Sequence, residues 1–391
     1  GALRRQRGHA VLAFGHGHGA GLARQLLEGL HQLVVGQQLG QGLALGRGQR
    51  QRMDEAQAQA AGLAGCRVRC VRRGELRVPW GYVASVAVDP IEKKPFFHVR
   101  PGATALSFGM LGCDFRCPFC QNWEISQTLR DPEAEPWAAP RPATPEGLVR
   151  AALEAGSEVV TSTYNEPLVT AEWALAVFGR AREAGLLTSF VSNGNATPEV
   201  LDALRPFVDA YKVDLKGMRE EGYRRVGGKL AVVLDALSGL VARGFWVEVV
   251  TLVVPGMNDS EEELRDAARF LRSLSPDLPW HVTAFHPDYR MSSTPATPVT
   301  TLLRAAEIGR EEGLRYFYTG NVASRAGRGE WTFCPACAEP LVERLGFRVL
   351  ACRLGPLGEC PRCGTGIPGL WRGASRPARG PGVGAGPEGP N

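Results

Sequence analysis

Apolar runs rich in β-branched residues alternate with amphipathic stretches six times between residues 104 and 320. The apolar runs predict strands at 104–110, 158–164, 188–192, 210–215, 246–254 and 281–285. The amphipathic stretches predict helices at 146–155, 168–184, 199–204, 230–242, 261–274 and 299–312. Because a repeated order of strand and helix builds a parallel sheet, the pattern predicts an α/β fold, most simply a partial (β/α)6 TIM-type barrel. A full barrel and an open doubly wound sheet are the alternatives.

Residues that begin and end helices support these limits. Thr197 and Pro198 stand before one predicted helix, and Ser260 with Glu263 forms a capping box before another. Glycines follow three of the predicted helix ends, at Gly185, Gly244 and Gly313.

The two ends of the chain differ in composition from this body. Residues 1–62 are dominated by Gly, Gln, Arg, Ala and Leu, with Phe14 as their only aromatic residue, so we expect an N-terminal extension of low order. The same composition is compatible with a mis-annotated start upstream of about Gly65. Residues 63–103 predict a small β-rich unit, in which Cys66 and Cys70 fit free thiols better than an intact zinc site. Residues 373–391 are rich in Pro and Gly and are predicted to be disordered.

Charge and composition exclude several classes of protein. The 391 residues carry a net charge of +5, of which residues 1–60 contribute +4 through seven arginines against three acidic residues. The rest of the chain is therefore close to neutral, which argues against a nucleic-acid surface or a charged membrane face. No apolar run reaches the about 18 residues that a membrane span needs. Ten cysteines without a secretion signal indicate a reducing, cytoplasmic location.

Three cysteines follow the first predicted strand of the body in the spacing C-x3-C-x2-C: Cys113, Cys117 and Cys120. An odd number of thiols on one short loop suits a metal better than a disulfide. Cysteine thiolates hold iron–sulfur clusters, and a four-iron cluster with only three protein ligands keeps one iron open. A zinc knuckle or a chance cluster is the alternative.

Polar residues also follow the other predicted strands. In a barrel the carboxyl ends of the strands converge on one rim, where catalytic groups lie. That rim receives Tyr164, Asn165, Glu166, Ser192, Asn193, Asp214, Lys216, Thr251 and His286. Individually these residues have ordinary explanations, such as a turn at Asn193 or a surface pair of Asp214 with Lys216. Six such sets in register with six strands favour an active site.

The body resembles a radical S-adenosylmethionine (SAM) enzyme of the AmmeMemoRadiSam-system type, a relative of pyruvate formate-lyase activating enzymes. The resemblance covers about residues 65–371. It is carried by DPIEKKPFFH (89–98), GCDFRCPFCQNWEISQ (112–127), TYNEP (163–167), VSNG (191–194), VDLKG (213–217), WVEVVTLVVPGMNDSEEEL (246–264), PWHVTAFHPDYRM (279–291) and GNV (320–322). One departure is that the family usually has further cysteines upstream of Cys66, whereas residues 1–62 contain none.

This resemblance implies roles for the rim residues. Cys113, Cys117 and Cys120 would ligate three irons of a 4Fe-4S cluster, and SAM would chelate the fourth. Electron transfer to the sulfonium would release methionine and a 5′-deoxyadenosyl radical, which abstracts hydrogen from the substrate. The remaining residues implied to bind SAM or substrate are Phe119 beside the adenine, Asn165 and Glu166 at the ammonium, Ser192 and Asn193 at the carboxylate or ribose, Asp214 and Lys216 at polar groups, and His286 facing the adenine or the substrate. A histidine that caps the core is the alternative for His286.

The partners implied are SAM, a reductant such as flavodoxin or ferredoxin, an unidentified small-molecule or protein substrate, and partner proteins of the same system. Activation of a glycyl-radical enzyme would require a rim open enough for a peptide loop, and closure by residues 286–295 or by the C-terminal module would count against it. A non-catalytic iron–sulfur or zinc protein is the other class, but it gives Asn165, Glu166, Asp214 and His286 no role.

A second cysteine pattern follows the barrel, which we expect to span residues 104–325. Within residues 326–372, two C-x2-C pairs lie on either side of a β-like stretch: Cys334 with Cys337, and Cys360 with Cys363. Four such thiolates can close a tetrahedral site, and the pattern resembles a zinc ribbon. Zinc is favoured, with a rubredoxin-like iron site as the alternative, because both metals accept four sulfurs in this geometry. Cys352 fits neither pair and is predicted to be a buried or spare thiol.

Overall fold

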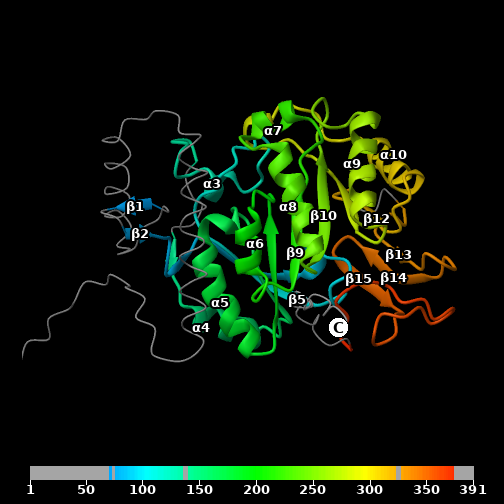
Figure 1. Cartoon of the computed structure of the whole chain (residues 1–391), viewed down its shortest axis with the longest axis horizontal. Helices are drawn as coiled ribbons and strands as arrows, with labels where there is room; N and C mark the ends of the chain where they lie inside the picture. Colours follow the sequence, from blue (N-terminus) through cyan, green and yellow to red (C-terminus); the bar gives the residue numbers. More distant parts are fainter. Residues whose placement is uncertain (1–69, 73–74, 135–139, 323–326, 374–391) are drawn as a thin grey trace, which may run out of the picture.

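The computed structural model describes residues 70–72, 75–134, 140–322 and 327–373 (Figure 1). The strands are β1 (Cys70–Arg72), β2 (Glu75–Arg77), β3 (Tyr82–Val83), β4 (Ser85–Pro90), β5 (Thr104–Gly109), β6 (Arg141–Pro142), β7 (Val159–Ser162), β8 (Leu187–Ser192), β9 (Ala210–Asp214), β10 (Trp246–Val253), β11 (Trp280–Ala284), β12 (Phe317–Gly320), β13 (Thr332–Phe333), β14 (Pro340–Leu345) and β15 (Arg348–Cys352). The helices are α3 (Trp123–Ser126), α4 (Pro145–Glu154), α5 (Ala171–Glu183), α6 (Pro198–Leu204), α7 (Glu220–Val226), α8 (Leu230–Ala242), α9 (Glu261–Leu274) and α10 (Val299–Glu311), with 3-10 turns η1 (Ile91–Lys93), η2 (Pro167–Thr170) and η3 (Tyr289–Met291).

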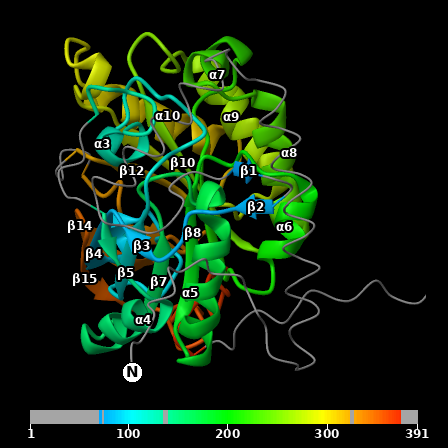
Figure 2. The ribbon, with the colours of Figure 1, turned by 90° about the vertical axis from the view of Figure 1, so that its left-hand side faces the viewer.

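An eight-stranded sheet in the order β12-β11-β10-β9-β8-β7-β5-β4 forms the centre of the molecule. The seven strands from β5 to β12 are parallel, and β4 lies antiparallel to β5 at one edge. Successive strands are always neighbours, so the crossovers all run in one direction and place their helices on one face. Figure 2 shows α5, α6, α8 and α9 along that face. A doubly wound sheet would reverse direction at a switch point, so the predicted partial barrel is confirmed.

The six predicted strands are present with ends that differ by at most two residues, but the sheet has two further members. β12 is only four residues long, too short to stand out as an apolar run. β4, which the sequence places in a separate β-rich unit, pairs with β5 from Ser85 opposite Gly109 to Pro90 opposite Thr104. Local pattern predicts that a strand exists, whereas its partner is chosen by long-range packing.

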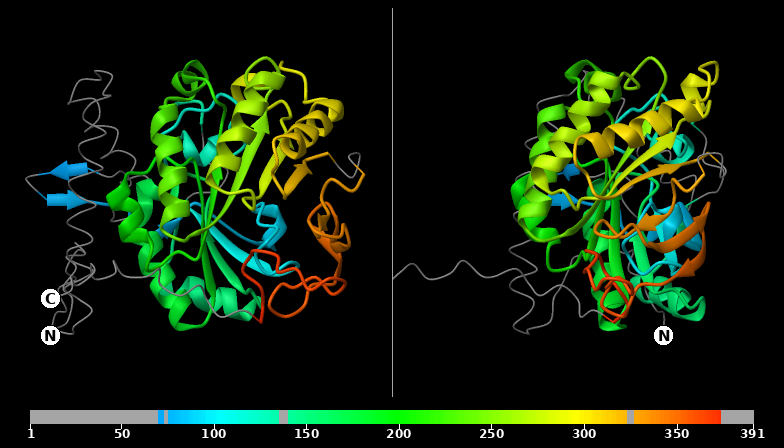
Figure 3. Two further views of the ribbon diagram at one scale, coloured as in Figure 1. Left: turned by 45° about the vertical axis from the view of Figure 1, so that its right-hand side comes forward. Right: turned by 90° about the vertical axis from the view of Figure 1, so that its right-hand side faces the viewer.

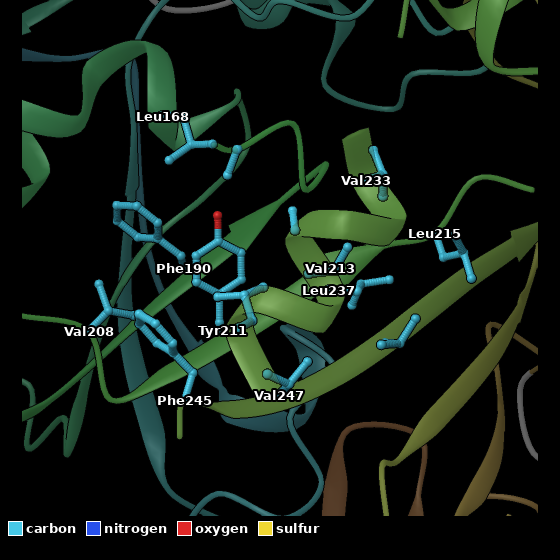
Figure 4. Close-up of a cluster of buried hydrophobic side chains, with 14 of the residues drawn as sticks. Leu168, Phe190, Val208, Tyr211, Val213, Leu215, Val233, Leu237, Phe245 and Val247 are labelled. Carbon is cyan, nitrogen blue, oxygen red and sulfur yellow. The ribbon is translucent and has the colours of Figure 1, made fainter. Parts of the chain in front are cut away.

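Each face of the sheet has its own apolar cluster. On the helix-covered face, Phe190, Tyr211 and Phe245 lie together with Val213 and Leu237 (Figure 4). On the concave face, Ala105, Val159 and Ala210 pack against residues 91–103, which include Ile91 and Phe96. Because side chains alternate between the faces of a strand, these two clusters identify which residues of every strand point into the barrel.

A buried carboxylate fixes the segment that fills the barrel. Glu248 of β10 is fully buried and accepts hydrogen bonds from the backbone N–H groups of Phe97 and His98, both at 2.9 Å. Its second oxygen also contacts His281 Nε2 at 2.8 Å. Burial acts to raise the pKa of Glu248, but the interactions with His281 and His98 and the hydrogen bond from the Phe97 N–H outweigh it and lower the pKa, so the carboxylate is ionised in the folded protein.

Strands β13–β15 form a three-stranded antiparallel sheet beside β12, on the side of the molecule away from α5 (Figures 1 and 3). This C-terminal module packs Leu341 and Trp371 against Phe97 and Tyr318. Arg344, which is fully buried, donates to the carbonyl of Phe97 at 2.7 Å. The module is therefore bound to the same segment that fills the barrel.

Several sequence predictions concern parts of the chain that the structure does not describe: the extension 1–62, the tail from 374 onward, and the thiols of Cys66 and Cys70. Among the helices that the structure describes, none combines the length and the apolar character needed to cross a bilayer.

Candidate functional site

The loop of three cysteines leaves the carboxyl end of β5 and is held by close packing rather than by regular structure. Phe115 inserts beneath Gly228, where a Cβ atom would lie only 2.3 Å from the ring. The backbone N–H of Arg116 donates to the carbonyl of Val226 at 2.7 Å, at the end of α7. The helix α7 was not predicted from the sequence, although the Gly227-Gly228 pair after it is a signal that could have located this contact.

The three thiols are enclosed by protein. Cys117 is 7% exposed, and burial raises the pKa of its thiol to about 12. Burial also raises the pKa of Cys113 and Cys120, and Cys120 Sγ lies 3.3 Å from Ser126 Oγ. Thiols with raised pKa values become thiolates only with a strong positive partner such as a metal.

Glu166 collects hydrogen bonds from two neighbouring strand ends. Its Oε1 accepts from Ser192 Oγ at 2.8 Å and from the N–H of Leu168 at 3.1 Å, and its Oε2 accepts from the N–H of Asn193 at 2.7 Å. Burial and the nearby Asp114 carboxylate raise the pKa of Glu166 to about 8, and these three hydrogen bonds only partly offset them. A cationic ligand would supply the positive partner that a buried, ionised Glu166 needs.

Asp114 joins this carboxylate to the cysteine loop and was missed by sequence reasoning. Its two oxygens accept from the side-chain amides of Asn193 and Asn195, each at 2.7 Å. Asn165, in the loop after β7, also links to the segment that leads into the cysteine loop, because its Oδ1 accepts from the N–H of Met110 at 3.0 Å. The sequence assigned Asn193 to the rim, with a turn as its ordinary explanation, but it offered no signal that Asn195 binds Asp114.

Asp214 lies between two lysines on the concave side of β9. Lys216 Nζ is 3.4 Å from Asp214 Oδ2, and Lys212 bonds the other oxygen. Lys216 Nζ also lies 5.9 Å from the ring centre of Phe119, which is buried between the second and third cysteines. The lysines outweigh burial and lower the pKa of Asp214. Asp214 and Lys216 thus belong to a partly buried group of three charges beside the cysteine loop, and not to the ordinary surface pair that was the alternative to a rim site.

His286 follows β11 and reaches the cysteine loop. Its Nε2 lies 2.8 Å from Gln121 Nε2, directly after Cys120. The next residues continue this contact, because Tyr289 stacks on Trp123 with ring centres 5.0 Å apart and Arg290 donates its backbone N–H to the carbonyl of Pro118 at 3.0 Å. His286 is exposed on the rim and is not a core-capping histidine.

Thr251 is the exception among the residues assigned to the rim. Its Oγ1 accepts from Trp280 Nε1 at 3.0 Å within the layer between the sheet and the helices. The prediction for Thr251 is wrong, because the alternation along β10 turns this position away from the barrel.

Comparison with known proteins agrees with this geometry. The family model of the radical SAM superfamily matches residues 109–271, from the end of β5 into α9. An uncharacterized protein of Methanocaldococcus jannaschii, MJ0808, is 39% identical over 293 residues, which cover 74% of this chain and 85% of that protein. The chain belongs to the radical SAM superfamily.

More distant similarities cover shorter parts of the chain. An isethionate sulfite-lyase activating enzyme of Oleidesulfovibrio alaskensis is 29% identical over 128 residues, covering 31% of this chain and 41% of that enzyme. Among solved structures, a domain of a pyruvate-formate lyase-activating enzyme of Bacteroides vulgatus has 19% identity and a TM-score of 0.38, covering 41% of this chain and 98% of that chain.

The C-terminal module of this radical SAM protein contains the second predicted cysteine group. The sulfurs of Cys334, Cys337, Cys360 and Cys363 all lie within 4.8 Å of one another. The Cys334–Cys363 and Cys337–Cys360 sulfur pairs are 3.6 Å and 3.7 Å apart. A tetrahedral ion with metal–sulfur bonds of about 2.3 Å would separate its sulfurs by roughly 3.8 Å. The four side chains are therefore already arranged for one metal ion, and Cys352 lies exposed outside the group.

Proposed function

We propose that this chain is a radical SAM enzyme that binds a 4Fe-4S cluster through Cys113, Cys117 and Cys120 and SAM beside it. When reduced, the cluster would supply the electron that cleaves SAM and produces a 5′-deoxyadenosyl radical. One observation carries the proposal: Asp114, next to the first cysteine, is hydrogen-bonded to Asn193, whose backbone N–H binds Glu166. The cluster loop and the carboxylate proposed for SAM thus belong to one connected site.

The protein residues bind and orient SAM in this proposal. Glu166, with Asn165 beside it, receives the SAM ammonium, which provides the missing positive charge for a buried carboxylate. Ser192 and Asn193 hold the SAM carboxylate or ribose while they position Glu166. Phe119 offers the face of its ring to the adenine.

The residues farther around the rim face the substrate. Lys216 and Asp214 provide charged groups for polar parts of SAM or of the substrate, and His286, in contact with Gln121, faces the adenine or the substrate. These residues come from β9 and β11, which are separated in the sheet by β10.

The remaining parts of the proposal concern the module and the cellular setting. We assign zinc to Cys334, Cys337, Cys360 and Cys363, in a C-terminal unit of residues 326–372 next to the barrel of residues 104–325. A cytoplasmic flavodoxin or ferredoxin would supply the electron. Membership of the AmmeMemoRadiSam system rests on the motifs of residues 89–98 and 112–127.

Activation of a glycyl-radical enzyme is the second candidate, because one relative carries the name isethionate sulfite-lyase activating enzyme. An activating enzyme must admit a peptide loop to the rim. Here residues 286–291 lie on the cysteine loop through the contacts of His286 with Gln121 and of Tyr289 with Trp123. This cover favours a smaller substrate over a peptide loop.

The proposal is tested with anaerobically reconstituted protein. We expect dithionite-reduced protein to cleave SAM to methionine and 5′-deoxyadenosine, and Cys117→Ala to lose both cluster absorbance and cleavage. Cys352→Ala is the matched control, since this thiol is exposed and outside both cysteine groups. If the loop instead held structural zinc, the purified protein would contain no iron and SAM would remain intact.

A further inference from the structure

Tyr164 has a backbone conformation that its side chain disfavours. It is the second residue after β7 and adopts φ +75°, in the left-handed region normally occupied by glycine. Strained conformations of bulky residues persist where the surroundings enforce them, and they concentrate at functional sites. Neither the proposed cluster nor the proposed SAM contacts use this residue.

The strained backbone brings the Tyr164 ring onto the concave face of the sheet. A Cβ atom on Gly109 would lie 3.0 Å from the ring and 2.6 Å from the carbonyl of Thr163, so only glycine permits this approach. Gly109 is on the same face as Ala105, which packs against the segment inside the barrel. Tyr164 therefore points into the barrel, directly beside the strand that leads to the three cysteines.

The phenol meets a buried ammonium there. Lys94 is 5% exposed, and its Nζ donates to Tyr164 Oη at 3.2 Å and to Asp89 Oδ2 at 3.0 Å. Asp89 lies opposite Ala105 in the sheet, which places it on the same concave face. Lys93 bonds the other Asp89 oxygen at 2.9 Å, so one carboxylate faces two ammonium groups and the cluster has a net charge of +1.

The hydrogen-bond geometry leaves donors for a ligand. An ammonium has three hydrogens, and Lys94 uses two of them on Asp89 and Tyr164. Tyr164 Oη accepts from Lys94 and also interacts with the buried Ser107 hydroxyl of β5, so its own hydrogen is directed away from Lys94. Burial raises the pKa of this phenol to about 12, which keeps the hydrogen in place. Two adjacent donors with a net positive charge match the two oxygens of a carboxylate or phosphate.

We propose that Lys94 and Tyr164 form the recognition site for an oxyanion group of the substrate, a carboxylate or a phosphate, inside the barrel. This inference rests on the proposed function, because it specifies the chemistry of the substrate that the radical would attack. A buried ion pair alone contributes little to stability, and a left-handed tyrosine opposes it. Recognition of a charged substrate accounts for both the buried Lys94–Asp89 ion pair and the left-handed conformation of Tyr164.

Tyrosine NMR on the full-length, cluster-reconstituted and oxidised protein tests this proposal. The seven tyrosines are labelled with 13C at Cζ, and the Tyr164 resonance is assigned by its loss in Tyr164→Phe. Acetate, inorganic phosphate and neutral acetamide are titrated separately at constant ionic strength. We expect a saturating shift of the Tyr164 resonance with acetate, phosphate or both, and none with acetamide. The anion that gives the tighter response identifies the group, while no response, or an equal response to acetamide, would overturn the proposal.

Three variants separate this site from general charge effects. Lys94→Gln should raise the Kd of the anion at least tenfold, whereas Lys93→Gln, at a lysine with the same Asp89 partner but 48% exposed, should change it less than twofold. Asp89→Asn removes the competing carboxylate and should lower the Kd several-fold, a gain that misfolding cannot produce. Equal effects of the two lysine variants, or no gain with Asp89→Asn, would contradict the assignment.

The titration requires no SAM cleavage, so the two proposals can fail separately. A protein that binds the anion but leaves SAM intact would overturn the proposed function alone. A protein that cleaves SAM while its Tyr164 resonance ignores anions would overturn only this assignment.

Discussion

The side-chain amide of Asn193 donates a 2.7 Å hydrogen bond to Asp114 Oδ1, which joins the end of β8 to the loop of three cysteines. The backbone N–H of the same residue donates to Glu166 Oε2 at the same distance. Asn193 thus binds two carboxylates that repel each other, the buried Glu166 and the partly buried Asp114, and it fixes the cluster loop relative to the proposed SAM site.

Asn193→Ala should therefore weaken SAM binding. A hydrogen bond to a charged group is worth about 1.5–3 kcal/mol, so its loss should raise the Kd for SAM about tenfold or more. Equilibrium binding of SAM to the oxidised, cluster-loaded protein measures this change. Ser238→Ala, whose hydroxyl donates to the carbonyl of Leu234 within α8, is the control and should bind SAM normally. An unchanged Kd for SAM in Asn193→Ala would show that the hydrogen bond between Asn193 and Asp114 does not contribute to SAM binding.

SAM affinity should depend on pH through Glu166. Its pKa in the folded, SAM-free protein is raised to about 8, so the carboxyl is neutral below that pH and must lose a proton to receive a cation. Affinity should rise up to about tenfold per pH unit toward pH 8 and level off above it. Calorimetry in buffers of different ionisation enthalpy should detect one proton released at pH 7, and Glu166→Gln should abolish the release. A flat profile in the unsubstituted protein would rule out this coupling.

The same pKa has a consequence for stability. Because the folded pKa of Glu166 lies above the unfolded value of 4.5, the unfolded chain ionises first as pH rises. The contribution of Glu166 to the free energy of unfolding should therefore decline between about pH 4.5 and pH 8 in the SAM-free protein. Urea unfolding at several pH values should show a smaller decline for Glu166→Gln than for the unsubstituted protein, and parallel profiles would contradict this origin.

Glu248 should make the opposite contribution. Its pKa is lowered in the folded state, so the stability that it provides is present above the unfolded pKa of 4.5 and is lost as the pH falls through the folded value. Glu248→Ala at neutral pH leaves His281 and two buried N–H groups without their acceptor, and should cost about 3–5 kcal/mol in urea unfolding. The exposed Glu262→Ala should cost less than about 0.5 kcal/mol, and a similar loss in both variants would refute the role of the buried carboxylate.

Metal in the C-terminal module should stabilise the chain, and iron binding by the three-cysteine loop should not depend on it. Cys360→Ser should remove one metal equivalent and lower Tm by several degrees or more, because the binding of a structural metal supplies folding free energy directly. Iron bound by the cysteine loop should stay near the level of the unsubstituted protein, and Cys352→Ser should change neither value. Metal analysis and thermal unfolding of the three proteins decide the question, and iron loss in Cys360→Ser would contradict the independence of the two groups.

Local signals in the sequence located much of this architecture. The alternation of apolar runs and amphipathic stretches located six strands and their helices, and Ser260 caps α9 through the N–H of Glu263 as the capping box predicts. The four cysteines of the C-terminal module were also found, because their C-x2-C spacing is a local property of the chain. Such features depend on residues that are close in sequence, where the backbone geometry is nearly fixed.

Contacts between distant segments could not be found in this way. β4 joined the sheet, Thr251 faced the helices, and Asp114 received two asparagines because the register of the strands put them there. A shift of one residue in strand register turns every side chain of the strand to the other face of the sheet, and the register cannot be predicted from composition.

The sequence by itself determined the α/β order, the three-cysteine loop and the four-cysteine module, since each is a pattern of neighbouring residues. Only the tertiary structure brought Lys94 and Asp89 against Tyr164, across 70 residues of chain, beside the strand that leads to the cysteine loop. The physical reason is that side-chain contacts inside a barrel depend on strand register, strand face and the close approach permitted by Gly109, and these are settled by packing of the whole sheet.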